Sequence, residues 1–336
     1  MSIPFLLAPM AELSHRALRE LIEGFGGCDG YFTEMISAGA LLAGAPFESW
    51  YIDGGPRPEK LVYQLTGADS RQIAKAAALL DLRECAGIDL NMGCSAPLIR
   101  KTGAGVAWMA SIDRAGELVS QVRRKVRHRL SVKLRIGFQD DFEYLVRFCR
   151  RLEAEGTDLI ILHPRTAGEK FKRLARWAYV GGLRRELHIP VAGNGDIASA
   201  AELCRRAAGP CDAVMAGRAA VRQPWIFARA RILEAQAPDT VSASGLSHIP
   251  YENFCINLEE TGLRFLEFLA RCQPPEFYLS RTRRFFSLFC DNLKWGNYLK
   301  TLLNREENLT GVERCWRGYF SEHGEETFLS CASPET

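Results

Sequence analysis

Residues 87–94 read Gly-Ile-Asp-Leu-Asn-Met-Gly-Cys, and this stretch indicates both the fold class and the place of the chemistry. Its apolar start, Gly87 to Leu90, predicts a short buried strand that turns through glycine and leaves one thiol, Cys94, just past its end. Parallel α/β barrels carry their reactive groups at such strand ends. Cys94 could donate a proton or attack a substrate there, and Asn91 could orient a polar ligand. The alternative interpretation of a single cysteine is a small buried hydrophobe.

Seven further short apolar segments share this character and alternate with amphipathic helical segments. Each is rich in Leu, Ile, Val or Phe with little polar alternation, as expected for parallel strands buried on both faces. Eight such units predict the α/β fold class, a (β/α)8 TIM barrel. A doubly wound open sheet is the alternative, disfavoured by the count and by the lack of a GxGxxG motif after the first strand. The predicted strands are Phe5 to Met10, Gly30 to Glu34, Leu61 to Leu65, Gly87 to Asn91, Ser131 to Ile136, Leu159 to His163, Pro190 to Gly193 and Ala213 to Met215. The predicted helices include Ser14 to Phe25, Ser70 to Leu80, Asp113 to Val126, Phe142 to Ala154 and Ala198 to Ala207.

The character of the chain changes after about residue 240. Residues 237–249 carry Pro, Ser, Gly and Asp and indicate a linker. Helical patterns follow at Tyr251 to Arg271, Glu276 to Leu293 and Asn297 to Asn304. We therefore expect a barrel domain over residues 1–240 and a C-terminal all-helical domain over residues 241–336.

Composition excludes several classes of protein. The 336 residues carry a net charge of only +3, so a nucleic-acid partner would have to use a local patch. The N-terminus lacks the pattern of a signal peptide, and no apolar run approaches the length of a membrane span. The 11 cysteines include no CxxC pair, which argues against a zinc ribbon or a disulfide framework. We expect a cytoplasmic monomer with no metal and no membrane partner.

Polar residues stand at the ends of most of the predicted strands, which a plain core would not need. Gln, Asn, Lys, His and Arg converging from several strands are better explained by a bound polar ligand. The last two strand ends indicate an anion, because glycines admit close backbone approach and Arg218 adds a fixed positive charge. Loops seven and eight are the usual phosphate site of a TIM barrel. The alternative is that these glycines only make tight turns. A buried Lys133 also needs an anionic or carbonyl partner, which a flavin ring offers.

Taken in order, the strand-end motifs resemble those of the tRNA-dihydrouridine synthases. The resemblance covers about residues 3 to 235 and is weaker over the helical tail. Each motif is weak by itself, whereas all eight in order at strand ends are specific. The motifs are Ala8-Pro9-Met10, Thr33-Glu34-Met35, Gln64-Leu65-Thr66-Gly67, Asp89-Leu90-Asn91-Met92-Gly93-Cys94, Val132-Lys133-Leu134-Arg135, His163-Pro164-Arg165-Thr166, Asn194-Gly195-Asp196 and Gly217-Arg218.

The resemblance implies an enzyme that binds FMN and tRNA and reduces particular uridines to 5,6-dihydrouridine, with NADPH as reductant. Cys94 then resembles the general acid, Asn91 the residue that positions the uracil, and Arg165 a contact with tRNA or substrate. The implied cofactor-binding residues are Pro9, Met10 and Ala11 in the first flavin-contacting segment, Gln64 at the pyrimidine edge, Lys133 near N1 and O2, His163 beside the flavin, and Asn194, Gly195, Asp196, Gly217 and Arg218 at the phosphate and ribityl chain.

The implied chemistry fits these residue types. Hydride reaches C6 of the uracil and a proton must reach C5, and a thiol is mostly protonated near neutral pH. The Gly-rich segment Gly103-Ala104-Gly105 has few side chains to hold it still and could act as a closing loop. The base must also leave the folded tRNA, so base flipping is implied. Departures from the family pattern include Ser95 where Pro is usual, with Pro97 two residues later, and His15 where Asp is common.

The chain has three basic segments, two of which are candidates for RNA contacts. The run Arg123 to Arg129 precedes the fifth strand, so we interpret it as a solvated helix end on the far face of the barrel. Lys170 to Arg173, with Arg176, follows the sixth strand on the active face and is a candidate phosphate contact. Arg281 to Arg284 in the tail mix with the aromatic residues Phe285, Phe286, Trp295 and Tyr298. We expect these aromatics in the helical core and the basic face on the RNA.

Two other functions remain open at this point. One is an FMN barrel that reduces a free pyrimidine, similar to dihydroorotate dehydrogenase, although that leaves the helical tail unexplained. The other is a barrel without redox chemistry, or one that only binds RNA. A colourless protein without flavin would favour the second.

Overall fold

The computed structural model describes residues 3–236 and 255–330. The chain forms two compact units. The first comprises residues up to Met10, Asp29–Ile197 and Arg206–Ala216; the second comprises Ala11–Cys28, Ala198–Arg205 and the residues from Gly217 onward. The predicted linker at 237–249 and the domain boundary at residue 240 lie outside the described residues. No helix in the described parts of the chain is long and apolar enough to cross a membrane.

The first unit contains a closed barrel of parallel strands, as predicted. Neighbouring strands pair in the order β2-β1-β9-β8-β7-β6-β5-β4, and the pairing of Tyr31 with Leu61 joins β2 to β4 and closes the ring. All eight predicted strands are therefore confirmed. They are β1 (Phe5–Leu7), β2 (Gly30–Phe32), β4 (Leu61–Thr66), β5 (Gly87–Met92), β6 (Arg129–Gly137), β7 (Leu159–Thr166), β8 (Val191–Asn194) and β9 (Ala213–Ala216). A further two-residue strand, β3 (Ile36–Ser37), pairs with the end of β4.

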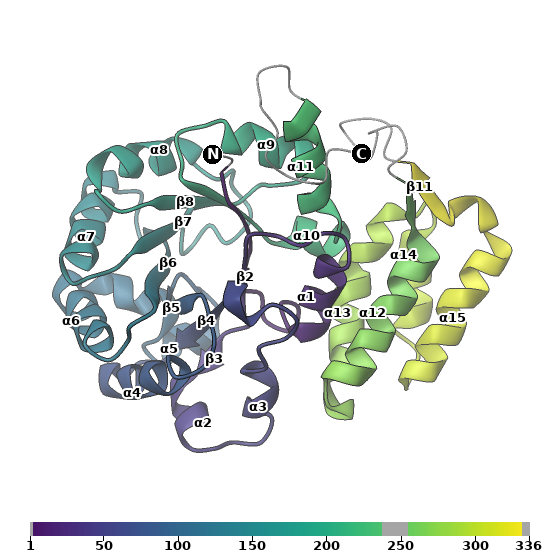
Figure 1. The fold of residues 1–336 in the computed structure, drawn as a ribbon, viewed down its shortest axis with the longest axis horizontal. Helices are drawn as coiled ribbons and strands as arrows, with labels where there is room; N and C mark the ends of the chain where they lie inside the picture. The colour runs from purple at the N-terminus through teal and green to yellow at the C-terminus, as the bar shows by residue number, and fades with distance from the viewer. Residues whose placement is uncertain (1–2, 237–254, 331–336) are drawn as a thin grey trace. The chain divides into compact units, whose positions relative to one another are not determined.

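Helices of the first unit lie around the outside of this barrel (Figure 1). Four begin at a side-chain cap that their sequences provide: Ser37, Asp69, Ser111 and Asp141 each accept a hydrogen bond from a backbone N–H of the first turn. The helices of this unit are α2 (Ala38–Leu42), α3 (Glu48–Tyr51), α4 (Ser70–Leu80), α5 (Pro97–Lys101), α6 (Ile112–Arg123), α7 (Phe142–Ala154) and α8 (Trp177–Glu186), with 3-10 turns η1 (Pro58–Lys60) and η2 (Gly105–Ala110).

The barrel interior contains an apolar core. Side chains alternate along a strand, so every second residue points inward. The inward residues pack into one cluster made of Leu6, Ala8, Phe32, Val62, Leu159, Ile161, Ala192, Ala213 and Met215. Polar residues follow these core residues along the strands. Because the strands are parallel, these polar residues lie together at the carboxyl end of the barrel.

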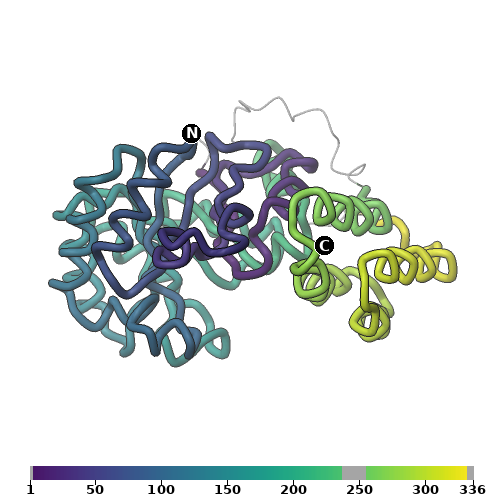
Figure 2. The backbone as a smooth tube through the Cα atoms, turned by 90° about the horizontal axis from the view of Figure 1, so that it is seen from below, coloured from purple at the N-terminus to yellow at the C-terminus, as the bar shows by residue number. Residues whose placement is uncertain are grey.

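The second unit is helical. Figure 2 shows its helices from residue 258 onward, coloured green to yellow, packed side by side. The elements are α1 (Arg16–Glu23), α9 (Ala200–Ala207), α10 (Arg218–Arg222), α11 (Ile226–Gln236), α12 (Leu258–Cys272), α13 (Tyr278–Phe289), α14 (Gly296–Leu303) and α15 (Leu309–Glu322), with 3-10 turns η4 (Pro275–Phe277), η5 (Cys290–Asn292) and η6 (Gly324–Glu326), and a two-stranded antiparallel ribbon of β10 (Cys255–Asn257) and β11 (Phe328–Ser330).

Aromatic rings form the core of this helical unit. Phe265 stacks on Phe285 at 3.7 Å between ring centroids, and Trp316 packs against Phe286 at 4.6 Å. The expectation that the aromatics of the tail are core is thus confirmed for Phe285 and Phe286. It is wrong for Trp295 and Tyr298, which are 50% and 59% exposed.

Candidate active site at the carboxyl ends of the barrel strands

A polar layer lies directly above the apolar core of the barrel. Gln64 stands two residues beyond the core residue Val62, His163 two beyond Ile161, and Asn194 two beyond Ala192. The even spacing keeps these side chains on the inward face of their strands. Asp89, Asn91 and Lys133 join them from β5 and β6, because Asp89 pairs with Gln64 and Asn91 with Lys133 in the sheet register. The structure therefore brings most of the predicted site residues to one end of the barrel.

A chain of buried hydrogen bonds runs through this layer. Gln64 is fully buried, and its Nε2 donates to Asp89 Oδ2 at 2.7 Å. Asn91 Nδ2 donates to Gln64 Oε1 at 2.8 Å. Ser131 Oγ donates to the other Asp89 oxygen at 2.6 Å. Asp89 orients the side-chain amide of Gln64, and Gln64 in turn orients the side-chain amide of Asn91.

The last link of this chain holds the backbone of Cys94. Asn91 Oδ1 accepts hydrogen bonds from the N–H groups of Cys94 at 2.9 Å and Gly93 at 3.2 Å. The carbonyl oxygen of Cys94 accepts from Val106 N at 2.9 Å. The thiol is free and half-buried. Both backbone groups of Cys94 are therefore fixed just beyond the carboxyl end of β5.

The segment after Cys94 has more regular structure than a plain loop. Pro97 is the first residue of α5, where proline is well tolerated, so the departure from the family pattern at Ser95 moves this proline into a helix start. Gly105 has φ +60°, and a Cβ there would lie 2.5 Å from the carbonyl oxygen of Cys94. The close approach of the two segments therefore requires glycine at position 105.

Burial shifts the two ionisable groups of this layer toward neutrality. Desolvation raises the pKa of Asp89 from 3.8 to about 7, against the hydrogen bonds from Ser131 and Gln64. Desolvation likewise lowers the pKa of Lys133 from 10.5 to about 8, with the Asp89 charge acting in the opposite direction. Lys133 Nζ donates to Asn194 Oδ1 at 3.0 Å, and Asn194 Nδ2 donates to Met215 O at 2.7 Å. Lys133 keeps further N–H groups for a ligand.

His163, Arg165 and Asp196 form a second connected group. Arg165 NH1 lies 2.9 Å from His163 Nε2, and its NH2 lies 2.5 Å from Asp196 Oδ1. Because a guanidinium can only donate, His163 Nε2 accepts and the proton of a neutral ring sits on Nδ1. Arg165 is 2% exposed, and its Nε donates to the carbonyl of Arg173. The structure therefore buries Arg165 between His163 and Asp196, and its contact with RNA stays a prediction.

The turn after β8 packs tightly against this group. Gly195 has φ +122°, and a Cβ there would lie 3.0 Å from the His163 ring. Asp196 has φ +55°, an unusual value for a residue other than glycine, and its carboxylate also accepts from Ala175 N at 2.6 Å. These bonds hold the strained turn against the His163 ring.

The remaining predicted cofactor residues lie next to barrel strands. Pro9 and Met10 follow β1, and Met10 packs against the apolar core of the barrel. Ala11, which is exposed, comes next and belongs to the second unit. Gly217 and Arg218 also belong to the second unit, where Gly217 precedes the first residue of α10. Their roles toward a cofactor stay predictions.

The sequence analysis assigned no individual role to two residues of this region. Arg135 is 5% exposed and donates to Gly93 O at 3.0 Å and to Lys170 O at 3.2 Å, so it ties the Cys94 segment to the loop after β7. Phe171 in that loop is 58% exposed, and its ring lies 6.0 Å from the His163 ring and 5.8 Å from the Arg135 guanidinium. An aromatic residue inside the basic segment 170–173 was the available signal.

The basic segments contain both ion-paired residues and exposed ones. Arg176 is held by Glu169, at 2.6 and 2.8 Å, and by Asp140, and the hydrogen bonds from Arg176 lower the pKa of Glu169 to about 2. Arg176 therefore forms structural ion pairs with Glu169 and Asp140, whereas Lys170, Lys172 and Arg173 are exposed to solvent. In the tail, Arg281 is buried and Arg284 pairs with Glu12 at 2.7 Å. An RNA contact by this tail surface stays a prediction.

The fold and the polar mouth define the class: a TIM-barrel enzyme with a thiol, a half-buried lysine and a buried histidine at the carboxyl ends of its strands. The family model for "Dihydrouridine synthase (Dus)" matches residues 6–249. The chain therefore belongs to the dihydrouridine synthase family of enzymes.

Its curated relatives agree with this assignment. A "Probable tRNA-dihydrouridine synthase" of Aquifex aeolicus is 33% identical over 66% of this chain and 71% of the relative. A "tRNA-dihydrouridine(16) synthase" of Ralstonia nicotianae is 31% identical over 69% and 74%. Among solved structures, a FabK mutant from Thermotoga maritima is similar at TM-score 0.40 and 14% identity, covering 67% of this chain and 64% of that one, a likeness too distant to inform function.

Proposed function

We propose that this protein reduces uridines in tRNA to 5,6-dihydrouridine, with FMN as cofactor and NADPH as reductant. The family assignment and the names of the relatives support the reaction and the RNA substrate. The observation that carries the proposal is the fixed geometry around Cys94, whose backbone N–H is 2.9 Å from Asn91 Oδ1 at the polar end of the barrel.

The residues at the barrel mouth fit a flavin. Lys133 donates one N–H to Asn194 Oδ1 and keeps further N–H groups for an anionic or carbonyl acceptor, and burial lowers its pKa to about 8. Gln64 keeps one amide N–H and one lone pair beyond its two bonds, which suits the mixed donor and acceptor edge of a pyrimidine ring. The turn at Gly195 and Asp196, which follows β8 at this end of the barrel, is the proposed position of the phosphate chain. When bound, FMN reduced by NADPH supplies the hydride for C6 of the uracil.

Cys94 is the proposed general acid. Its thiol donates the proton to C5 of the uracil and is left as a thiolate near the Lys133 and Arg135 charges. Asn91 fixes the backbone of Cys94 through Oδ1 and retains one N–H for the base. The side-chain amide of Asn91 therefore has two proposed roles: it positions the acid Cys94 and orients the uracil.

The RNA must bring an unstacked base into this mouth. Base flipping is required because the reacting groups lie inside the barrel rim. The exposed residues Lys170, Lys172 and Arg173 are the proposed phosphate contacts at this end, and Phe171 beside His163 offers a ring for stacking. A monomeric, cytoplasmic protein stays our expectation.

The test uses purified protein, tRNA from a strain without dihydrouridine, FMN and NADPH. The expected results are flavin absorbance at about 450 nm and dihydrouridine in the tRNA, measured by mass spectrometry of its nucleosides. Free uridine and orotate are the controls. Reduction of a free pyrimidine without formation of dihydrouridine in tRNA would refute the proposal. A colourless protein that does not bind added FMN would also refute it.

A further inference from the structure

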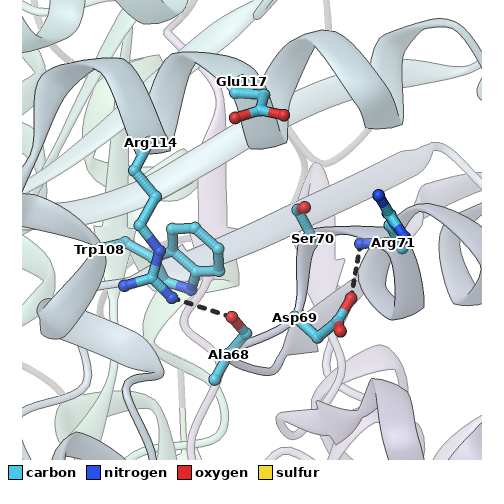
Figure 3. A pocket seen from close by; sticks show the side chains of 7 residues that line it. All are labelled: Ala68, Asp69, Ser70, Arg71, Trp108, Arg114 and Glu117. Atoms are coloured by element: carbon cyan, nitrogen blue, oxygen red, sulfur yellow. Dashed lines mark hydrogen bonds between the residues drawn. The ribbon is translucent and has the colours of Figure 1, made fainter.

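A hollow with a volume of about 320 Å³ lies between the first turns of α4 and α6 (Figure 3). It belongs entirely to the first unit of the chain. None of its lining residues is part of the candidate active site described above. Its lining residues are Ala68, Asp69, Ser70, Arg71, Trp108, Arg114 and Glu117.

One side of this hollow is a flat cationic platform. Trp108 is 2% exposed, and its Nε1 donates to Gly67 O at 2.8 Å. The guanidinium of Arg114 lies 4.0 Å from the Trp108 ring centroid and donates to Ala68 O at 2.9 Å. Figure 3 shows Arg114 laid over the indole with its end directed at Ala68. The stack and the hydrogen bond hold the guanidinium plane in place, so its outer face can receive another planar group.

The other walls carry both donors and acceptors. Arg71 lies across the hollow from Arg114 in Figure 3, and within the described residues its guanidinium has no hydrogen-bond or ion-pair partner. Glu117 accepts from Gln121 through one oxygen at 3.0 Å, which leaves the second oxygen. Asp69 Oδ1 caps α4 through two backbone N–H groups. Two cations thus face two carboxylates.

This balance of charges selects the ligand. A phosphate has only acceptors and would be repelled by Asp69 and Glu117. A guanine base presents N–H donors at N1 and N2 beside acceptors at O6 and N7, which match a carboxylate and an arginine respectively. Adenine would instead place a ring-nitrogen acceptor against the carboxylate. The pocket is therefore complementary to guanine.

The hollow also lies at the same end of the barrel as Cys94. Gly67 directly follows β4, the strand of Gln64, and Trp108 belongs to η2, whose Val106 N–H donates to the Cys94 carbonyl. An RNA that places one base at the barrel mouth passes over this end of the first unit. We propose that the hollow binds the base of an unpaired guanosine of the tRNA, with Arg114 stacking on it, Glu117 accepting its N–H groups and Arg71 donating to its acceptor edge. This rests on the proposed function.

The experiment is a footprint of tRNA with kethoxal, which modifies N1 and N2 of unpaired guanine. NADPH is omitted so that no turnover occurs. The wild-type protein is expected to protect at least one unpaired guanosine. Glu117→Ala and Arg114→Ala are each expected to abolish that protection and to weaken tRNA binding about tenfold, the usual scale for a lost base-edge contact. Lys125→Ala, an exposed cation before β6 at the opposite end of the barrel, is the matched control and should change neither.

Unchanged protection in both pocket variants would overturn the inference. So would binding of free guanosine monophosphate that depends on Glu117 while the footprint stays unchanged, because the pocket would then serve a free nucleotide. Glu117→Gln, which keeps the shape of the side chain, decides the matter if a truncation unfolds the protein. Unchanged protection together with dihydrouridine formation refutes only the guanosine pocket. Glu117-dependent protection without dihydrouridine formation refutes only the proposed reaction.

Discussion

The side-chain oxygen of Asn91 accepts a hydrogen bond from the backbone N–H of Cys94 at 2.9 Å, three residues along the chain. The amide of Asn91 is itself held by Gln64 at 2.8 Å. The candidate acid is thus oriented from the inside of the barrel. The backbone position of Cys94 therefore depends on the hydrogen bonds of Gln64 and Asn91 in the buried polar layer.

Asn91→Ala should therefore slow turnover by about 10²-fold, on the scale of a misplaced catalytic group, while leaving the protein folded. Asn91→Asp keeps an oxygen for the Cys94 N–H but loses the donor to Gln64. It should retain more activity than Asn91→Ala. The check is kcat for dihydrouridine formation beside the melting temperature of each variant; equal loss in both variants would show that the bond to Cys94 is unimportant.

Gly105→Ala should disturb the same region from the other side. The residue has φ +60°, and its new Cβ would lie 2.5 Å from the Cys94 carbonyl oxygen. We expect a loss of about 1 kcal/mol or more in stability, together with a fall in kcat. Gly318→Ala is the control, because nothing lies within 4 Å of a Cβ there. Full activity of Gly105→Ala would mean that the Cys94 segment moves without consequence.

The ion pair of Arg165 with Asp196 predicts a strong, non-additive effect on stability. Arg165→Met leaves the Asp196 carboxylate and the His163 ring without their buried partner, and should cost about 3–5 kcal/mol. The double variant with Asp196→Asn should lose less than the sum of the two single variants. Denaturant unfolding measures all three. Strict additivity would show that the pair is not coupled.

Asp89 predicts a pH dependence of stability. Its folded pKa of about 7 is above the ordinary value of 3.8, so the folded state holds the proton more tightly. The corresponding stability is fully present below the unfolded pKa and is lost as the pH rises through about 7. Asp89→Asn removes this titration, so it should lower stability less at about pH 7.5 than at about pH 5. Parallel curves for the free energy of unfolding against pH would contradict the raised pKa.

The eight strands could be predicted because each is a short apolar run between glycines and polar turns. The helix α8 was not among the predicted helices because Gly181 and Gly182 lower its propensity; the structure uses both for close packing, against Pro210 and Phe142. The helix α15 was missed for the same reason, since Gly311 and Gly318 interrupt its pattern. Tertiary packing overrides local preference in both helices.

The residues of the candidate site could be predicted from their types and positions at strand ends. Their hydrogen-bond partners could not. Strand ends locate Gln64, Asn91 and Lys133, since the carboxyl ends of parallel strands meet at one end of a barrel. That Asn91 is bonded to Gln64, or that Arg165 is buried on Asp196, depends on the register between strands. Sequence pattern does not contain that register, so the hydrogen-bond network had to come from the structure.

The most direct test of the account is the rate of dihydrouridine formation by Cys94→Ala. The variant should bind flavin and tRNA as the wild type does, with turnover slower by about 10²–10⁴-fold, the scale for losing a general acid. The measurement is the amount of dihydrouridine formed per chain over time in tRNA that initially lacks it. Turnover equal to that of the wild type would contradict the account, because another group would then deliver the proton.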